Sequence, residues 1–241
     1  MHDSATAPDP HPLDNPGHGS LVGAHAHLAV RRGRALAYEL EISPFTALPD
    51  DPDAADWAHL AEIVQDTGRP EASIFGLATP MPPGWSTLFS VECAQLVGTD
   101  VVGAPDPEAV RLTVADVPEM LDLVARTRPG PFQPGTIHLG TYLGIRRQGR
   151  LVAMAGERMH PPGHTEISAV CTDPEARGQG LGSRLIRAVA HGILERGETP
   201  YLHAVTSNQA ALRLYVSLGF VVRRQITIAG YSPPASAPST S

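Results

Sequence analysis

The chain has 241 residues, of which 42% are hydrophobic, and a formal net charge of −7, so it can bury a core and lacks the basic surface of a general nucleic-acid-binding protein. Two cysteines, Cys93 and Cys171, exclude a disulfide framework and predict reduced thiols, and no HExxH or paired CxxC motif indicates a metal site. Without a signal peptide or an apolar run of membrane-spanning length, the expected setting is the cytoplasm, with no membrane, nucleic-acid or metal partner.

Both ends of the chain have compositions that do not support a core. Residues 1–20 are rich in Pro, Asp, Gly and His and are predicted to form a flexible segment, and residues 232–241 a disordered tail. Between them, the run Gly103-Ala104-Pro105-Asp106-Pro107 breaks regular structure. We therefore expect an N-terminal α/β extension or divergent half-domain over residues 21–105, with no readable role, and a second domain over residues 106–231.

The first half is predicted to contain a hairpin, a helix and two strands. The apolar runs His25–Val30 and Arg34–Leu40 are joined by a Gly-containing turn, which is typical of a hairpin. A helix that Asp53 can cap presents four apolar residues on one face: Trp57, Leu60, Ala61 and Val64. Strand-like runs follow at 72–78 and 87–97, and nothing in this half indicates chemistry.

The second half is predicted to run strand, helix, three strands, helix, strand, helix and strand. Its strands are expected at 110–114, 138–147, 151–159, 164–172, 201–206 and 220–228. One helix follows Asp116, which is expected to form a capping box with Glu119; one runs from Leu181 to Arg196, and one follows Ser207 or Asn208. The predicted fold class is therefore α/β (α+β), a mixed, mostly antiparallel central sheet flanked by helices.

A glycine-rich loop, Arg177-Gly178-Gln179-Gly180-Leu181-Gly182, joins the 164–172 strand to the next helix. Backbone N–H groups at the start of a helix have no partner within it, and together with the helix dipole they bind phosphate. Glycines let a ligand approach the backbone closely, and Arg177 adds positive charge. The loop predicts an anionic phosphate ligand without identifying it.

The segment from Thr172 to Gly182 resembles the acetyl-CoA motif of GNAT N-acetyltransferases, Arg/Gln-x-x-Gly-x-Gly/Ala after a strand. Downstream, the segment from Asn208 to Phe220 is similar to that family's second motif, Asn-x-x-Ala-x-x-x-Tyr-x-x-x-Gly-Phe. The resemblance covers about residues 109–229. It implies an acyl-CoA N-acyltransferase fold, acetyl-CoA as co-substrate, a small-molecule or peptide amine as acceptor, and a monomer or homodimer.

The resemblance also assigns roles to residues of both motifs. The cofactor-binding residues are expected to be Val170, Cys171, Thr172, Arg177, Gly178, Gln179, Gly180, Leu181, Gly182, Ser183, Asn208, Ala211 and Tyr215. The backbone of Val170 and Thr172 would pair with the pantetheine arm and the loop amides would hold the pyrophosphate, while the Cys171 side chain would pack elsewhere. Tyr215 would protonate the leaving thiolate, although it also fits as a core aromatic, and Asn208 also fits as a helix cap only.

The implied reaction is direct attack of a neutral amine on the thioester through a tetrahedral intermediate. An amine such as lysine has a pKa of about 10.4, so a base must first remove a proton. Glu166 and Glu157 are equal candidates for this base, and each also fits as an ion-pair partner. A backbone N–H near Val170 would stabilise the oxyanion.

Two other functions fit parts of the sequence. A non-catalytic acyl-CoA-binding module would keep the loop without the chemistry. A dinucleotide-binding oxidoreductase would use the glycine loop through Ser183 with Glu198, which follows at about the 20-residue distance of that motif. The antiparallel strands before the loop, and the position of Glu198 before the next strand, argue against the oxidoreductase.

Overall fold

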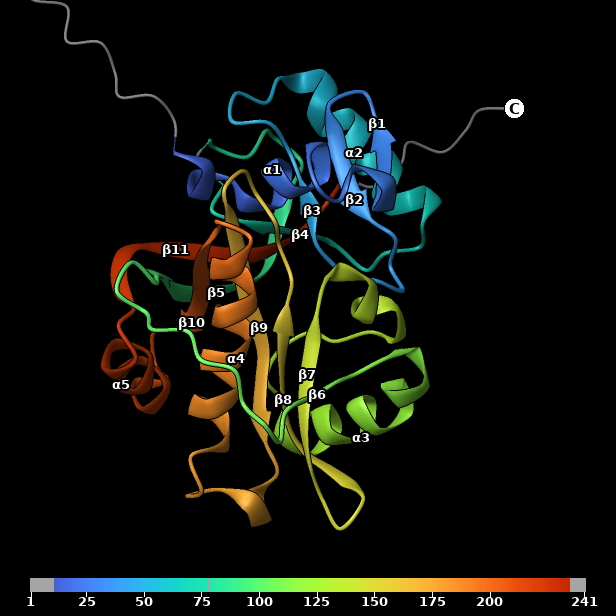
Figure 1. Ribbon diagram of the computed structural model, residues 1–241. Helices are drawn as coiled ribbons and strands as arrows, with labels where there is room; N and C mark the ends of the chain where they lie inside the picture. The colour runs from blue at the N-terminus through green and yellow to red at the C-terminus, as the bar shows by residue number, and fades with distance from the viewer. Residues whose placement is uncertain (1–10, 78, 235–241) are drawn as a thin grey trace, which may run out of the picture.

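The computed structural model describes residues 11–77 and 79–234, and its centre is an eight-stranded mixed sheet (Figure 1). In spatial order the strands are β4 (Ala72–Phe75), β11 (Val221–Ser232), β5 (Ser86–Val97), β10 (Thr199–Val205), β9 (His164–Thr172), β8 (Arg150–Glu157), β7 (Tyr142–Arg147) and β6 (Val110–Arg111). Every neighbouring pair in this order is antiparallel except β9 and β10, which are parallel. The predicted mixed, mostly antiparallel sheet is confirmed.

Helices cover both faces of this sheet. α4 (Leu181–Glu195) packs its predicted stripe against one face, where Leu185, Val189 and Ile193 are fully buried. α3 (Val117–Thr127) buries Met120 and Leu123 against the other face. The alternation of β8 separates the two helices, because Ala153 and Ala155 join the α4 core whereas Met154 joins the α3 core. The short helix α5 (Gln209–Ser217) packs on the α4 side.

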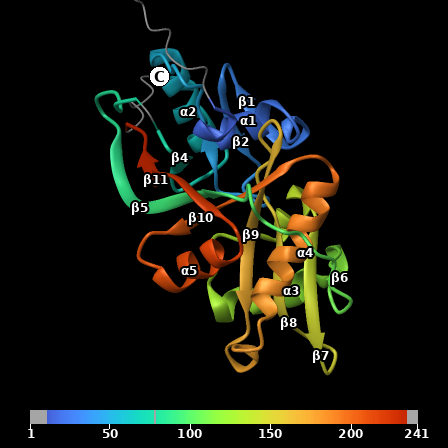
Figure 2. The same cartoon turned by 60° about the vertical axis from the view of Figure 1, so that its left-hand side comes forward.

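The N-terminal part forms a layer of its own beside the edge of the large sheet (Figures 1 and 2). It comprises α1 (Pro16–Val22), a three-stranded sheet of β1 (Ala29–Arg32), β2 (Ala35–Tyr38) and β3 (Thr46–Ala47), and α2 (Ala54–Asp66). The predicted hairpin is confirmed over residues 29–38, but residues 26–28 form a 3-10 helix instead of strand. Asp53 caps α2 as predicted, in a capping box with Asp56.

The expected flexible segment 1–20 differs from the structure over its described part, residues 11–20. A 3-10 helix (Pro12–Asp14) and the start of α1 occupy this stretch, and Leu13, at 0% exposure, and Pro16 are buried. The Leu13 carbonyl accepts a hydrogen bond from the buried Gln95 side chain at 2.8 Å. A few well-placed apolar residues therefore anchor a segment whose average composition is polar. Residues 1–10 and 235–241, which hold the rest of the two predicted flexible ends, lie outside the described residues.

The expected division near residue 105 does not coincide with an edge of the sheet. β5 comes from the N-terminal half, yet it lies between β10 and β11 of the second half and pairs with both. The connection that follows β5 crosses α4, where Ala104 N–H donates to the Arg187 carbonyl at 3.1 Å (Figure 1). A Cβ on Gly103 would lie 2.6 Å from the His191 Cα, so only glycine allows this crossing. Both halves thus contribute to one core.

Two local predictions in the second half need correction. Asp116 does not cap α3 with its side chain; its carboxylate instead accepts from the Thr113 backbone at 2.8 Å and closes a capping box one turn earlier. Glu119 pairs with Arg146 at 2.9 Å instead of with a helix terminus. The predicted strand at 138–147 begins only at Tyr142, because Pro134–Leu139 forms a 3-10 helix.

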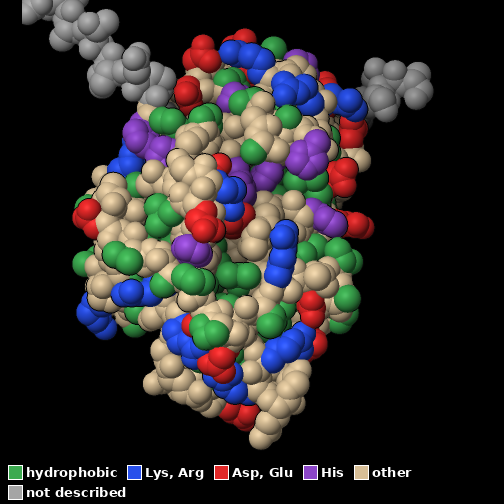
Figure 3. Space-filling view, viewed as in Figure 1, with side chains coloured by type: hydrophobic (Ala, Val, Ile, Leu, Met, Phe, Trp, Pro, Cys, Tyr) green, Lys and Arg blue, Asp and Glu red, His purple; other side chains and the backbone are tan. Residues whose placement is uncertain are grey.

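On the side shown in Figure 3, basic side chains are interspersed with acidic ones. Within residues 11–77 and 79–234, no helix combines the length and apolar character needed to cross a membrane.

Candidate functional site

The parallel strands β9 and β10 separate after a short paired stretch and leave a cleft in the middle of the sheet. Their pairing is limited to His164–Glu166 with Thr199–Tyr201. Beyond it lies a cavity of about 350 Å³ lined by Thr127, Arg128, Pro129, Val170, Cys171, Thr172, Arg177, His203, Ala204, Val205, Asn208, Ala211 and Tyr215. Strand edges that have separated can pair with an extended ligand, because their backbone donors and acceptors on that side lack a neighbouring strand.

A β-bulge reshapes β9 at the cleft. The register with β8 shifts between Cys171 and Ser168, and Ala169 has a φ of 52°, in the left-handed region that a non-glycine residue rarely adopts. Such a conformation costs on the order of 1 kcal/mol or more and is found preferentially at functional sites. The bulge lies directly before Val170, the residue whose backbone was predicted to face the acyl group.

The glycine loop forms the start of α4 as predicted. Gly178 and Gly180 have φ values of 79° and 71°, so side chains there would be strained, and Gly180 caps the helix without any side chain. From Gly178 to Ser183 the backbone N–H groups have no acceptor among the described residues. This row of unpaired donors at the positive end of a 15-residue helix can bind an anion.

The other loop residues divide between the cleft and its surroundings. Arg177 lines the cleft and its Nε donates to the Thr172 carbonyl at 3.4 Å, while Leu181 is buried beneath the loop at 2% exposure. Gln179 lies instead in a neighbouring cavity of about 310 Å³ that Arg150 also lines. Gly182 lies next to β9, since a Cβ on it would be 3.8 Å from the Thr172 hydroxyl oxygen.

α5 supplies the wall opposite β9. Asn208 both lines the cleft and caps α5, accepting from the Ala211 N–H at 3.1 Å, so the two readings of this residue are compatible. Tyr215 lines the cleft and packs edge-on against Phe220, with 6.1 Å between ring centroids. Burial raises the pKa of Tyr215 above its ordinary value, which keeps its phenol protonated at neutral pH.

Glu166 is a buried ion-pair partner beneath the sheet. It is 0% exposed and accepts two hydrogen bonds from Arg158, at 2.7 and 2.6 Å. Burial raises its pKa, but the charge and hydrogen bonds of Arg158 and the contact with His203 outweigh burial and hold the pKa at about 2. Such a carboxylate is a weak base, and it is absent from the lining of the cleft.

Glu157 lies away from the cleft, against α4. Its carboxylate accepts from the Thr141 N–H at 3.1 Å and from Arg196 at 3.0 Å, and it lines a separate cavity with Ala188 and Val189. The structure therefore brings the strand residues, Arg177 of the loop and the predicted residues of α5 together around the cleft, and it leaves both predicted carboxylates outside that group.

A buried polar network below the cleft was not predicted from the sequence. The Gln95 Oε1 accepts from Arg223 at 2.8 Å, so its amide nitrogen donates to the His203 Nε2 at 3.1 Å. The His203 Nδ1 must then carry the proton and donates to Glu166 at 2.7 Å. Because the His203 side chain is only 2% exposed, the part of His203 that reaches the cleft is its main chain.

Sequence reasoning also missed the end of α3, whose residues Thr127, Arg128 and Pro129 border the cleft. Their only signal was the Pro129-Gly130-Pro131 break, which marks a helix end but no ligand. Over the described residues, no group of three or more His, Cys, Asp or Glu side chains is arranged to hold a metal ion.

Comparisons with known proteins agree with this geometry. A family model described as FR47-like protein matches residues 142–228, the stretch from β7 into β11. A crystal structure of an acetyltransferase from the GNAT family of Novosphingobium aromaticivorans is 40% identical and covers 94% of this chain and 100% of that one, with a TM-score of 0.82. That likeness includes the N-terminal part of the chain.

Two curated relatives match about half of the chain each. The N-alpha-acetyltransferase RimI of Mycobacterium tuberculosis is 36% identical over 120 residues, which cover 45% of this chain and 75% of RimI. The mycothiol acetyltransferase of Thermomonospora curvata is 36% identical over 126 residues, or 50% of this chain. The chain spans only 40% of the length of that mycothiol acetyltransferase. From its fold, its cleft and these relatives, the chain belongs to the GNAT family of N-acetyltransferases.

Proposed function

We propose that the protein transfers an acetyl group from acetyl-CoA to a primary amine. The observation that supports this most is the cleft itself: free edges of β9 and β10 lead to the unpaired amides at the start of α4. Bound acetyl-CoA would supply the thioester carbonyl that an amine attacks. The proposed setting is the cytoplasm, and the active unit a monomer or homodimer.

Each wall of the cleft has a part in the proposed binding. The backbone of Val170 and Thr172 would pair with the amide groups of the pantetheine arm as an added strand does. The amides from Gly178 to Gly182 would hold the diphosphate, with Arg177 adding charge at the mouth. Asn208 and Ala211 would flank the arm from α5, and the backbone near Val170 would donate to the developing oxyanion.

Tyr215 is the proposed acid that protonates the departing thiolate. It lines the cleft, and its raised pKa keeps the proton available. The base role expected of Glu166 or Glu157 has less support, since arginines already hold both carboxylates. We propose instead that a chain of water molecules in the cleft relays the proton of the amine to bulk solvent, so that the neutral amine attacks the thioester.

The acceptor is proposed to be a small molecule or peptide with a primary amine. Among the relatives, RimI is named for acetylation of an α-amine and the mycothiol acetyltransferases for mycothiol. Both names are consistent with a cleft that is open to solvent on the side of Arg128 and Pro129, which are not buried.

The test is release of free CoA from acetyl-CoA across a panel of primary amines that includes amino acids, short peptides and amino sugars. Turnover with at least one amine, and none with the matching secondary acetamides, supports the proposal. Binding of CoA without turnover on any amine would favour the non-catalytic module. Thermal stabilisation by NAD and not by CoA would favour the oxidoreductase, although the antiparallel β7, β8 and β9 do not form its parallel units.

A further inference from the structure

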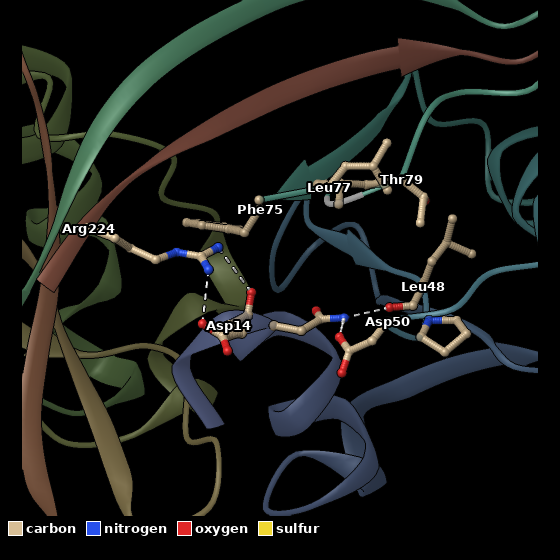
Figure 4. A pocket seen from close by; sticks show the side chains of 11 residues that line it. Asp14, Leu48, Asp50, Phe75, Leu77, Thr79 and Arg224 are labelled. Carbon is tan, nitrogen blue, oxygen red and sulfur yellow. Dashed lines mark hydrogen bonds and ion pairs between the residues drawn. The ribbon is translucent and has the colours of Figure 1, made fainter. Parts of the chain in front are cut away.

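A second cavity lies where the N-terminal segment meets the β4 edge of the large sheet (Figure 4). It has a volume of about 270 Å³ and is lined by Asp14, Asn15, Leu48, Pro49, Asp50, Ile74, Phe75, Gly76, Leu77, Thr79 and Arg224. It shares no lining residue with the acyl cleft. Arg224 on β11 pairs with Gln95 on β5, and β5 pairs in turn with β10, which lines the cleft. Two strand spacings, or about 10 Å of sheet, therefore separate this wall from the cleft.

One wall of the cavity has a surplus positive charge beside it and one unpaired donor. Arg224 lines the cavity and pairs with Asp14 at 2.9 Å, and Arg223, which is not part of the lining, pairs with the same carboxylate at 2.6 Å, so two cations share one anion. The Arg224 Nε is buried and finds no acceptor among the described residues. The Thr79 hydroxyl also finds no partner there, but it lies on the Leu48 side of the cavity in Figure 4. A buried donor left without an acceptor is costly, and the surplus charge beside Asp14 is positive, so this wall suits an anionic oxygen.

The opposite wall has an uncompensated carboxylate. Asp50 accepts from the Asn15 side-chain amide at 2.9 Å, and no arginine pairs with it in the part of the chain that the structure describes. The same Asn15 amide also donates to the Leu48 carbonyl at 2.8 Å, which uses both of its protons. The second oxygen of Asp50 is therefore available for a cation.

Apolar side chains separate the two charged walls. In Figure 4, Arg224 and Asp14 lie on one side and Leu48 and Asp50 on the other, with Phe75 and Leu77 between and above them. Ile74 and Phe75 are 4% and 3% exposed, so β4 contributes a dry surface to the space between the charges. A ligand that fits must carry an apolar segment between its ends.

We propose that this cavity binds a short linear zwitterion, with its carboxylate at Arg224 and its ammonium group at Asp50. The apolar segment of the ligand lies over Leu48 and Phe75. The site is distinct from the acyl cleft and does not depend on acetyl transfer.

The test is calorimetric titration, without any CoA species, of 6-aminohexanoate, hexanoate and hexylamine, which share a chain length and differ only in their charged ends. The zwitterion is expected to bind about tenfold more tightly than either probe with one charge, since each charged contact is removed in one of them. Asp50→Asn should weaken 6-aminohexanoate and hexylamine about fivefold and leave hexanoate unchanged, and Arg224→Gln should do the reverse.

Glu62→Gln is the matched control, because Glu62 is an exposed carboxylate on α2 that does not line the cavity. Thermal unfolding followed by circular dichroism establishes that each variant is folded. Asp50→Asn keeps the test valid even if Arg224→Gln fails to fold. Equal affinity for the three probes, no binding by folded protein, or equal loss of all probes in Asp50→Asn would each overturn the proposal.

Discussion

Replacing Glu166 by glutamine should destabilise the fold far more than it affects chemistry. The substitution leaves Arg158, whose side chain is 12% exposed, without its carboxylate beneath the sheet. A fall in the pKa of Glu166 from 4.5 to about 2 corresponds to about 3 kcal/mol at about 1.4 kcal/mol per pKa unit. Removing one partner of a buried ion pair costs about 3–5 kcal/mol, so the two arguments agree.

Urea unfolding followed by tryptophan fluorescence measures this loss. The rings of Trp57 and Trp85 pack with their centroids 5.0 Å apart in the N-terminal core, so unfolding changes their surroundings. Glu157→Gln is the matched control: its partner Arg196 is 41% exposed and can turn to water, so about 1 kcal/mol or less should be lost. Acetyl transfer per folded molecule should survive in Glu166→Gln. A stable variant without turnover would refute this reasoning and restore Glu166 as the base.

The ion pair of Glu166 with Arg158 predicts how the stability of the protein changes with pH. The folded-state pKa of Glu166 lies below its unfolded value, so its contribution is complete above about pH 4.5 and disappears as the pH falls toward 2. The difference in unfolding free energy between the wild type and Glu166→Gln should therefore be constant from pH 7 to 5 and shrink at pH 3. A difference that grows on acidification would contradict the assigned charge state.

Three further predictions follow from the site and the sheet. Tyr215→Phe should lower kcat about 100-fold in the CoA-release assay and leave the KM for acetyl-CoA nearly unchanged, and an unchanged kcat would remove Tyr215 from the mechanism. Gly180→Ala forces a Cβ into a backbone with φ 71° and should cost about 1 kcal/mol in thermal unfolding while weakening CoA in calorimetry; unaltered CoA affinity would argue against the loop. A chain that begins at residue 106 should not fold, as judged by circular dichroism, since it lacks β5 between β10 and β11, and a cooperative melt of that fragment would show two independent domains.

Local sequence signals predicted the second half well, because its elements are marked by periodicity and punctuation. The Leu181–Arg196 pattern gave α4 to within one residue, and the run at 164–172 gave β9 with its observed bounds. The glycine loop could be located because a helix start without side-chain caps leaves amides unpaired wherever it occurs.

Long-range pairing explains what the sequence could not show. The position of β5 between two strands of the other half depends on contacts more than 100 residues apart, for which no local pattern exists. The network of Gln95, His203 and Glu166 joins three strands in the same way. Glu166 was predicted as a candidate base because strand alternation shows which face of the sheet a residue lies on, but does not show that Arg158 pairs with it on that face.

Hydrogen exchange of backbone amides with and without CoA measures whether the cofactor lies along β9 and β10 and on the start of α4. CoA is expected to slow exchange at the amides from Gly178 to Ser183 and along the free edges of β9 and β10, near Val170 and Ala204. Binding of CoA that leaves the amides of the α4 start unprotected, or that protects another surface instead, would contradict this position of the cofactor.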